Sequence, residues 1–141
     1  MIKFNHLPDN ILELLPGAAQ YLGNNPKTVF AYLFGGLAKR APSPLSDVDI
    51  AVYLADNLYF KDDKLNILGN LMNILQTDEI DLIILNAASL PMIINVLKNK
   101  RIIVDKDPFA RHIFESLSMR KYFDFSVKEA ELLKRRYLHG C

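Results

Sequence analysis

Residues 29–54 have the sequence VFAYLFGGLAKRAPSPLSDVDIAVYL, which predicts two strands of a sheet. Residues 29–34 form a continuous apolar and aromatic run, typical of a strand that is covered on both faces. Gly35 and Gly36 end this run, and a loop that contains two prolines follows. Residues 47–54 then alternate with a period of two, which predicts a second strand.

The second predicted strand carries two carboxylates on the same face. Asp47 and Asp49 are two residues apart, so their backbone positions are about 6.6–6.8 Å apart and their side chains point the same way. Strands are depleted in Asp, and a buried carboxylate costs several kcal/mol unless it is paired or binds metal. Mutual repulsion favours a divalent cation between the two groups. Oxygen-only ligands suit Mg²⁺, with Mn²⁺ as the alternative.

A third carboxylate, Asp81, lies near the start of the apolar run 79–85, which predicts another buried strand. If this strand pairs beside residues 47–54, three acids face one site. Such a cluster can hold two cations about 3.5–4 Å apart, the arrangement that serves phosphoryl and nucleotidyl transfer. The N–H groups of Gly35 and Gly36 are candidates to bind the phosphate oxygens, because glycine lets the backbone come close to a ligand.

Two further residues are candidate nucleotide contacts. Lys39, with Arg40 beside it, follows the glycine pair by about one turn and supplies positive charge. Ser46 either terminates the proline loop or contacts the substrate through its hydroxyl. Each feature has a plain structural alternative: a glycine pair alone is more often a tight turn, the basic pair can be a solvated helix end, and Asp81 can be an edge residue. The combination of the features is what predicts chemistry.

The rest of the chain predicts an α/β fold, in which a small mixed sheet is packed against helices and followed by a helical C-terminal extension. Further elements are expected as helices at 10–21, 61–76 and 89–98 and as an edge strand at 101–104. The helix at 61–76 is expected to bury a stripe formed by Leu65, Leu68, Leu71, Met72 and Leu75. We expect one domain, 1–141, with a core at about 10–105 and the extension at about 107–139.

Composition excludes several classes of protein. The 141 residues contain 17 basic and 16 acidic side chains, for a net charge of +1, so a general nucleic-acid coat is disfavoured. The single cysteine, Cys141, allows no internal disulfide and indicates a cytoplasmic protein. No apolar segment approaches the roughly 18 residues of a membrane span.

The order of these motifs resembles the nucleotidyltransferase superfamily of the DNA polymerase β type. More closely, the sequence is similar to the minimal nucleotidyltransferase family, whose members include MntA-like antitoxins. The resemblance covers about residues 29–105 and rests on the glycine pair, on Asp47-Val48-Asp49, and on Asp81 in the third acidic position.

This resemblance implies the transfer of AMP from ATP to a hydroxyl, usually that of a tyrosine on a HEPN-family (HepT-like) toxin, which the transferase silences as its antitoxin. It implies that Asp47 and Asp49 bind two Mg²⁺ ions, and that Asp81 binds the ion that activates the acceptor. The glycine pair and Lys39 would stabilise the departing pyrophosphate.

One departure from the family pattern leaves alternatives open. The family usually has Gly-Ser where this chain has Gly35-Gly36, and the missing serine contacts a triphosphate oxygen. A catalytically impaired antitoxin that neutralises its partner by occlusion is therefore one alternative. A small-molecule transferase of the aminoglycoside type is another, for which a homodimer would supply the acceptor site.

Overall fold

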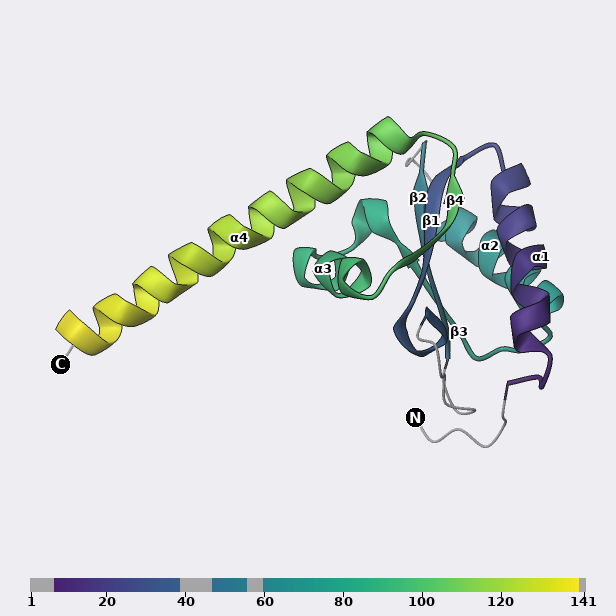
Figure 1. Ribbon diagram of the computed structural model, residues 1–141, viewed down its shortest axis with the longest axis horizontal. Coiled ribbons are helices and arrows are strands. Elements are labelled where there is room, and N and C mark those ends of the chain that lie inside the picture. The colour runs from purple at the N-terminus through teal and green to yellow at the C-terminus, as the bar shows by residue number, and fades with distance from the viewer. Residues whose placement is uncertain (1–6, 39–46, 56–59, 140–141) are drawn as a thin grey trace.

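The computed structural model describes residues 7–38, 47–55 and 60–139. Its centre is a four-stranded sheet in the order β3-β2-β1-β4 (Figure 1). The strands are β1 (Thr28–Phe34), β2 (Val48–Leu54), β3 (Ile80–Ile84) and β4 (Arg101–Asp105). β1 is antiparallel to both β2 and β4, whereas β2 and β3 are parallel. The predicted small mixed sheet is confirmed, with β4 at one edge.

Helices cover both faces of this sheet (Figure 1). α1 (Ile11–Asn24) and α2 (Phe60–Leu75) pack on one face, where Val48, Ile50 and Val52 of β2 enter the core. α3 (Leu90–Lys98) and the first turns of α4 (Pro108–His139) pack on the other face, which contains Ala51 of β2. Since β2 alternates between the two cores, the side chains of odd-numbered β2 residues lie on the α3 face.

Two short 3₁₀ helices, η1 (Gly35–Ala38) and η2 (Leu85–Ala87), follow β1 and β3. Side chains cap the start of α3 and the start of α4, whereas Asn10 makes no side-chain cap hydrogen bond at the start of α1. The Ser89 side chain accepts a hydrogen bond from the Met92 N–H (3.4 Å) at the start of α3. Asp107 accepts one from the Ala110 N–H (3.1 Å) at the start of α4. These side chains satisfy N–H groups that have no partner within the helix.

The buried stripe of α2 differs from the prediction at one position. Leu71 and Leu75 are fully buried as expected, but Leu65 is 69% exposed and Ile67 is buried in its place. Ile67, Leu71 and Leu75 are four residues apart, so they form one row along the helix. Leu65 precedes Ile67 by two residues, or about 200° of helical rotation, and therefore faces solvent.

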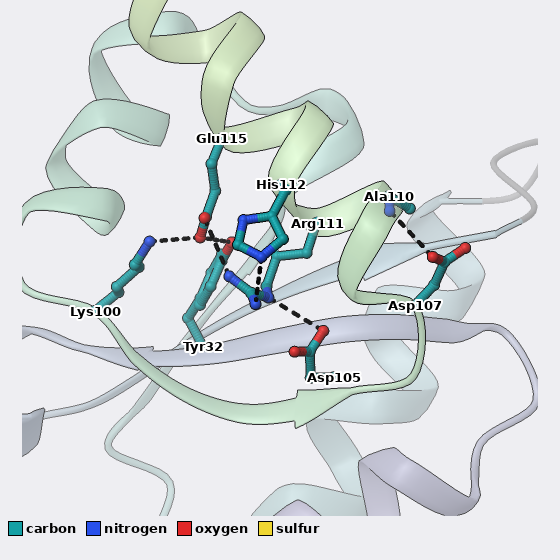
Figure 2. Close-up of polar contacts among 8 residues, drawn as sticks. All are labelled: Tyr32, Lys100, Asp105, Asp107, Ala110, Arg111, His112 and Glu115. Carbon is teal, nitrogen blue, oxygen red and sulfur yellow. Dashed lines mark hydrogen bonds and ion pairs between the residues drawn. The ribbon is translucent and has the colours of Figure 1, made fainter.

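Polar contacts fasten the start of α4 to the sheet (Figure 2). The Tyr32 hydroxyl donates to Glu115 Oε2 (2.7 Å), and Lys100 donates to the same oxygen. Arg111 donates to Glu115 Oε1 (3.1 Å) and its Nε lies 3.1 Å from Asp105 Oδ1 as an ion pair. The Glu115 carboxylate thus joins α4 to β1 and to the loop between α3 and β4.

The same contacts shift the pKa values of Glu115 and Tyr32. Burial by itself would raise the pKa of Glu115, but hydrogen bonds from Lys100 and Tyr32 and the nearby positive charges outweigh it, so the pKa is lowered. Burial and the hydrogen bond to Glu115 raise the pKa of Tyr32. At neutral pH Glu115 is therefore charged and Tyr32 is a neutral donor.

The C-terminal part of α4 extends away from the sheet as a long arm (Figure 1). Its described side chains from 119 to 135 are mostly exposed, including the apolar Met119, Phe123, Phe125 and Leu132. No helix in the described part of the chain is both long and apolar enough to cross a bilayer.

Candidate active site

The parallel pairing of β2 with β3 brings two of the predicted acids together. Asp49 and Asp81 are partners in the register of the two strands. Val48 and Ile50 on β2, like Leu82 on β3, enter the core beneath α1 and α2, so Asp49 and Asp81 lie on the opposite face. Neighbouring strands are about 4.8 Å apart, which lets two carboxylates on one face reach the same cation.

Asp47 directly precedes β2, two residues before Asp49. Asp47 and Asp49 are half-buried and Asp81 is exposed, so the three differ in their access to solvent. Within residues 7–38, 47–55 and 60–139, no three Asp, Glu, His or Cys side chains are already gathered as a metal-ligand group. The backbone register thus brings the carboxylates to one sheet end, and rotation of their side chains would complete a ligand set.

Gly35 adopts a conformation that the site requires. Its φ is +69°, in the left-handed region that favours glycine. A Cβ atom added here would lie 2.1 Å from Oδ2 of Asp49, far inside van der Waals contact. The Asp49 carboxylate therefore lies directly against the backbone of Gly35, so these two residues form one local structure. Gly35 and Gly36 are the first two residues of η1.

Two predicted nucleotide contacts, Lys39 and Ser46, lie outside the described residues, as does Arg40. The described part of the site therefore consists of the glycine pair, Asp47, Asp49 and Asp81.

A pocket of about 420 Å³ beside Asp81 was not predicted from the sequence. Asp81 and the following β3 residues line it, together with Lys61 and Lys64 from α2 and Ser89 and Met92 from the start of α3. The two lysines are three residues apart at the start of a helix, so they share one face. The three-residue spacing of the two lysines could have indicated this pocket, but the same spacing is typical of an ordinary solvated helix surface.

A family model described as polymerase beta nucleotidyltransferase matches residues 18–109, which is more than half of the chain. Comparison with curated protein sequences finds no significant match.

Solved structures of toxin–antitoxin complexes are similar in fold. A chain from a toxin–antitoxin complex with AMP-PNP has a TM-score of 0.66 at 23% identity, over 89% of this chain and 94% of that one. A chain from the toxin–antitoxin complex MntA–HepT has a TM-score of 0.60 at 24% identity, over 89% and 92%. A chain from the complex of a tri-AMPylated Shewanella oneidensis HEPN toxin with its MNT antitoxin has a TM-score of 0.61 at 21% identity, over 89% and 92%.

At these identities, the likeness to solved structures establishes the fold. The family match establishes more, because it spans the glycine pair, all three acids and the four strands of the sheet. The chain belongs to the polymerase β nucleotidyltransferase family, whose reaction is the transfer of a nucleotidyl group.

Proposed function

We propose that this chain transfers AMP from ATP to a tyrosine hydroxyl of a HEPN-family toxin and so acts as that toxin's antitoxin. The observation that carries the proposal is the pairing of Asp49 with Asp81 on one sheet face, with the Asp49 carboxylate against Gly35. Family membership supports the reaction class. The likeness to a complex that contains an AMPylated HEPN toxin supports a HEPN toxin as the acceptor protein.

We propose that Mg²⁺ binds at this site, because the donor set is made of carboxylate oxygens, which suit that ion. Asp47 and Asp49 would hold two ions, and Asp81 would share the ion nearer the acceptor. Bound Mg²⁺ supplies charge neutralisation on the phosphates and makes the acceptor hydroxyl more acidic.

The protein groups would act on both ends of the reaction. Asp81 would accept the proton of the tyrosine hydroxyl as the tyrosine oxygen forms a bond to the α-phosphorus of ATP. The bond from that phosphorus to the bridging oxygen breaks, and pyrophosphate leaves. N–H groups of Gly35 and Gly36, with Lys39, would bind the charge that develops on pyrophosphate. Because ATP is the donor, we propose the cytoplasm as the place of action. We also propose that a single domain, 1–141, is the acting unit.

The direct test is intact mass spectrometry. The chain is incubated with ATP, Mg²⁺ and a HEPN-family protein from the same genome, and the HEPN protein is examined for added AMP. The expected result is an adduct on a tyrosine that is lost in the variant Asp47→Ala with Asp49→Ala. Asp78→Ala, which removes an exposed carboxylate outside the described site, serves as the control. No adduct, or one that survives the double substitution, contradicts the proposal.

Neutralisation by occlusion alone is a second candidate function. It is favoured by glycine at position 36, where the family usually has a serine that contacts a triphosphate oxygen. Calorimetry with ATP and Mg²⁺ separates the two functions. A chain that forms a complex with the HEPN protein on a sizing column but binds no nucleotide acts by occlusion.

A further inference from the structure

β3 is an edge strand with one unpaired side. It pairs with β2, and no strand in the described part of the chain pairs with its other side. The Val48 N–H donates to the Glu79 carbonyl (2.9 Å). Alternation along a parallel ladder then turns the backbone groups of Asp81 and Ile83 toward β2, and those of Leu82 and Ile84 outward. Outward N–H and C=O groups on an edge strand are a template for a further strand.

The pocket of about 420 Å³ lies along this free edge. Residues 81–84 of β3 line it, and α2 and α3 contribute lining residues from the two faces of the sheet. We call this cavity the β3 trough. Its lining by a strand edge between two helices fits an extended peptide better than a compact ligand, because an extended chain satisfies the outward backbone groups.

Charge differs between the two ends of the β3 trough. Asp81 is at the start of β3. Residues 76–79 join the end of α2 to the start of β3, so the first turn of α2 lies beside the far end of the strand. That turn carries Lys61 and Lys64, which both line the trough and are both exposed. One end of the trough therefore has the acid of the proposed reaction, and the other end has two positive charges.

We propose that the β3 trough binds the acceptor segment of the protein substrate as an added strand. The acceptor hydroxyl lies at Asp81, and an acidic side chain of the segment lies at Lys61 and Lys64. The role of the hydroxyl rests on the proposed function, whereas the binding of an acidic, extended segment does not.

The pleat of the sheet fixes the spacing within that segment. Leu82 and Ile84 point to the face covered by α2, whereas Asp81 and Ile83 point to the opposite face. In a docked strand, side chains alternate between the two faces of the sheet. If the acceptor hydroxyl lies on the face of Asp81, only residues an odd number of positions from the tyrosine lie on the face of the two lysines. Three residues span about 10 Å, the length from Asp81 to Ile84. The preferred acceptor therefore has Asp or Glu three residues from its tyrosine.

Two labelled synthetic peptides of identical composition test this spacing. Both are rich in Val and Thr and contain one Tyr, with Glu three residues from the Tyr in one peptide and two residues away in the other. Binding to the full chain is measured by fluorescence anisotropy without ATP. We expect the peptide with the three-residue spacing to bind about three- to tenfold more tightly than the other peptide, a difference that corresponds to two partly exposed charge pairs. Lys61→Glu with Lys64→Glu should remove this preference, and Lys128→Glu on the α4 arm should leave it unchanged.

N-methylation of the peptide tests the backbone pairing without any change to the protein. In a strand added to β3, alternate peptide N–H groups point toward β3 and the others point to solvent. Methylation of one alternate set should abolish binding, and methylation of the other should be tolerated. Equal effects of the two sets overturn the proposal, as does the absence of any peptide binding up to about 1 mM.

AMP transfer to the HEPN protein, measured on the same samples, separates this inference from the proposed function. Peptide binding with the expected spacing and methylation pattern, but no AMP transfer, keeps the trough as a docking site and removes the transferase function. AMP transfer together with peptide binding that is indifferent to spacing, to the two lysines and to N-methylation overturns the trough and keeps the transferase.

Discussion

Gly35→Ala tests whether the glycine pair and the acid site form one structure. An alanine at φ +69° is strained by about 1–2 kcal/mol. Its Cβ would lie 2.1 Å from Oδ2 of Asp49, so the carboxylate must also move. Gly69→Ala in α2 is the matched control, because a Cβ there meets nothing within 4 Å. A helical Gly-to-Ala change at an open position should add about 0.5–1 kcal/mol of stability.

The two variants should therefore move in opposite directions. For a domain of this size, about 1 kcal/mol corresponds to roughly 3–5 °C in Tm, so Gly35→Ala should melt about 3–10 °C below the parent. The fold should survive, because domains are typically stable by about 5–15 kcal/mol. Displacement of Asp49 by about 1 Å should slow AMP transfer about 10²-fold. Thermal unfolding by circular dichroism and transfer rates by intact mass give both readouts. A Gly35→Ala chain with the parent's Tm and rate would show that Asp49 does not depend on Gly35 for its position.

Three further predictions concern the scaffold. Glu115→Gln should lower the free energy of unfolding by about 1–3 kcal/mol at neutral pH, because it weakens the contacts to Lys100 and Arg111. Because the fold lowers the pKa of Glu115, the difference in unfolding free energy between parent and variant should persist above the ordinary Glu pKa of about 4.3. The difference should shrink as the pH falls below that value. A difference that is constant with pH contradicts a stabilising role of the Glu115 charge. Pro16→Ala should raise the free energy of urea unfolding by about 1 kcal/mol, since Pro16 lies inside α1 and lacks an N–H; a loss of stability would mean that α1 needs the proline for its packing. Truncation after Ser118 should leave Tm within about 2 °C, because the described arm residues are mostly exposed; a large drop would show that the arm packs on the domain in solution.

The sheet could be predicted because strand periodicity is local. Alternation in residues 47–54 predicts which face each side chain occupies, and the structure has Val48 and Ile50 in the core beneath α1 and α2. The pairing of Asp49 with Asp81 depends in addition on β3 lying parallel to β2. We assumed this pairing and did not predict it from the sequence. The connection through α2 allows it, because a helix that joins two strands favours their parallel pairing.

Other features depend on contacts that no local pattern contains. Leu65 and Ile67 are equally apolar, and only the packing of α2 on the sheet and α1 decides that Ile67 is buried. Tyr32 and Glu115 are 83 residues apart in sequence, so their hydrogen bond has no sequence signal. The β3 trough arises where α2 and α3 flank a strand edge, and that depends on the complete fold.

In the proposed site, Asp49 and Asp81 bind the same cation. A double-mutant cycle with Asp49→Asn and Asp81→Asn tests it, with Mn²⁺ affinity measured by electron paramagnetic resonance in the presence of ATP. We predict that each single change weakens Mn²⁺ binding at least tenfold and that the double change costs clearly less than the sum, because the two side chains share one ligand. Parent-like Mn²⁺ affinity in Asp81→Asn, or two effects that simply add, would contradict the account.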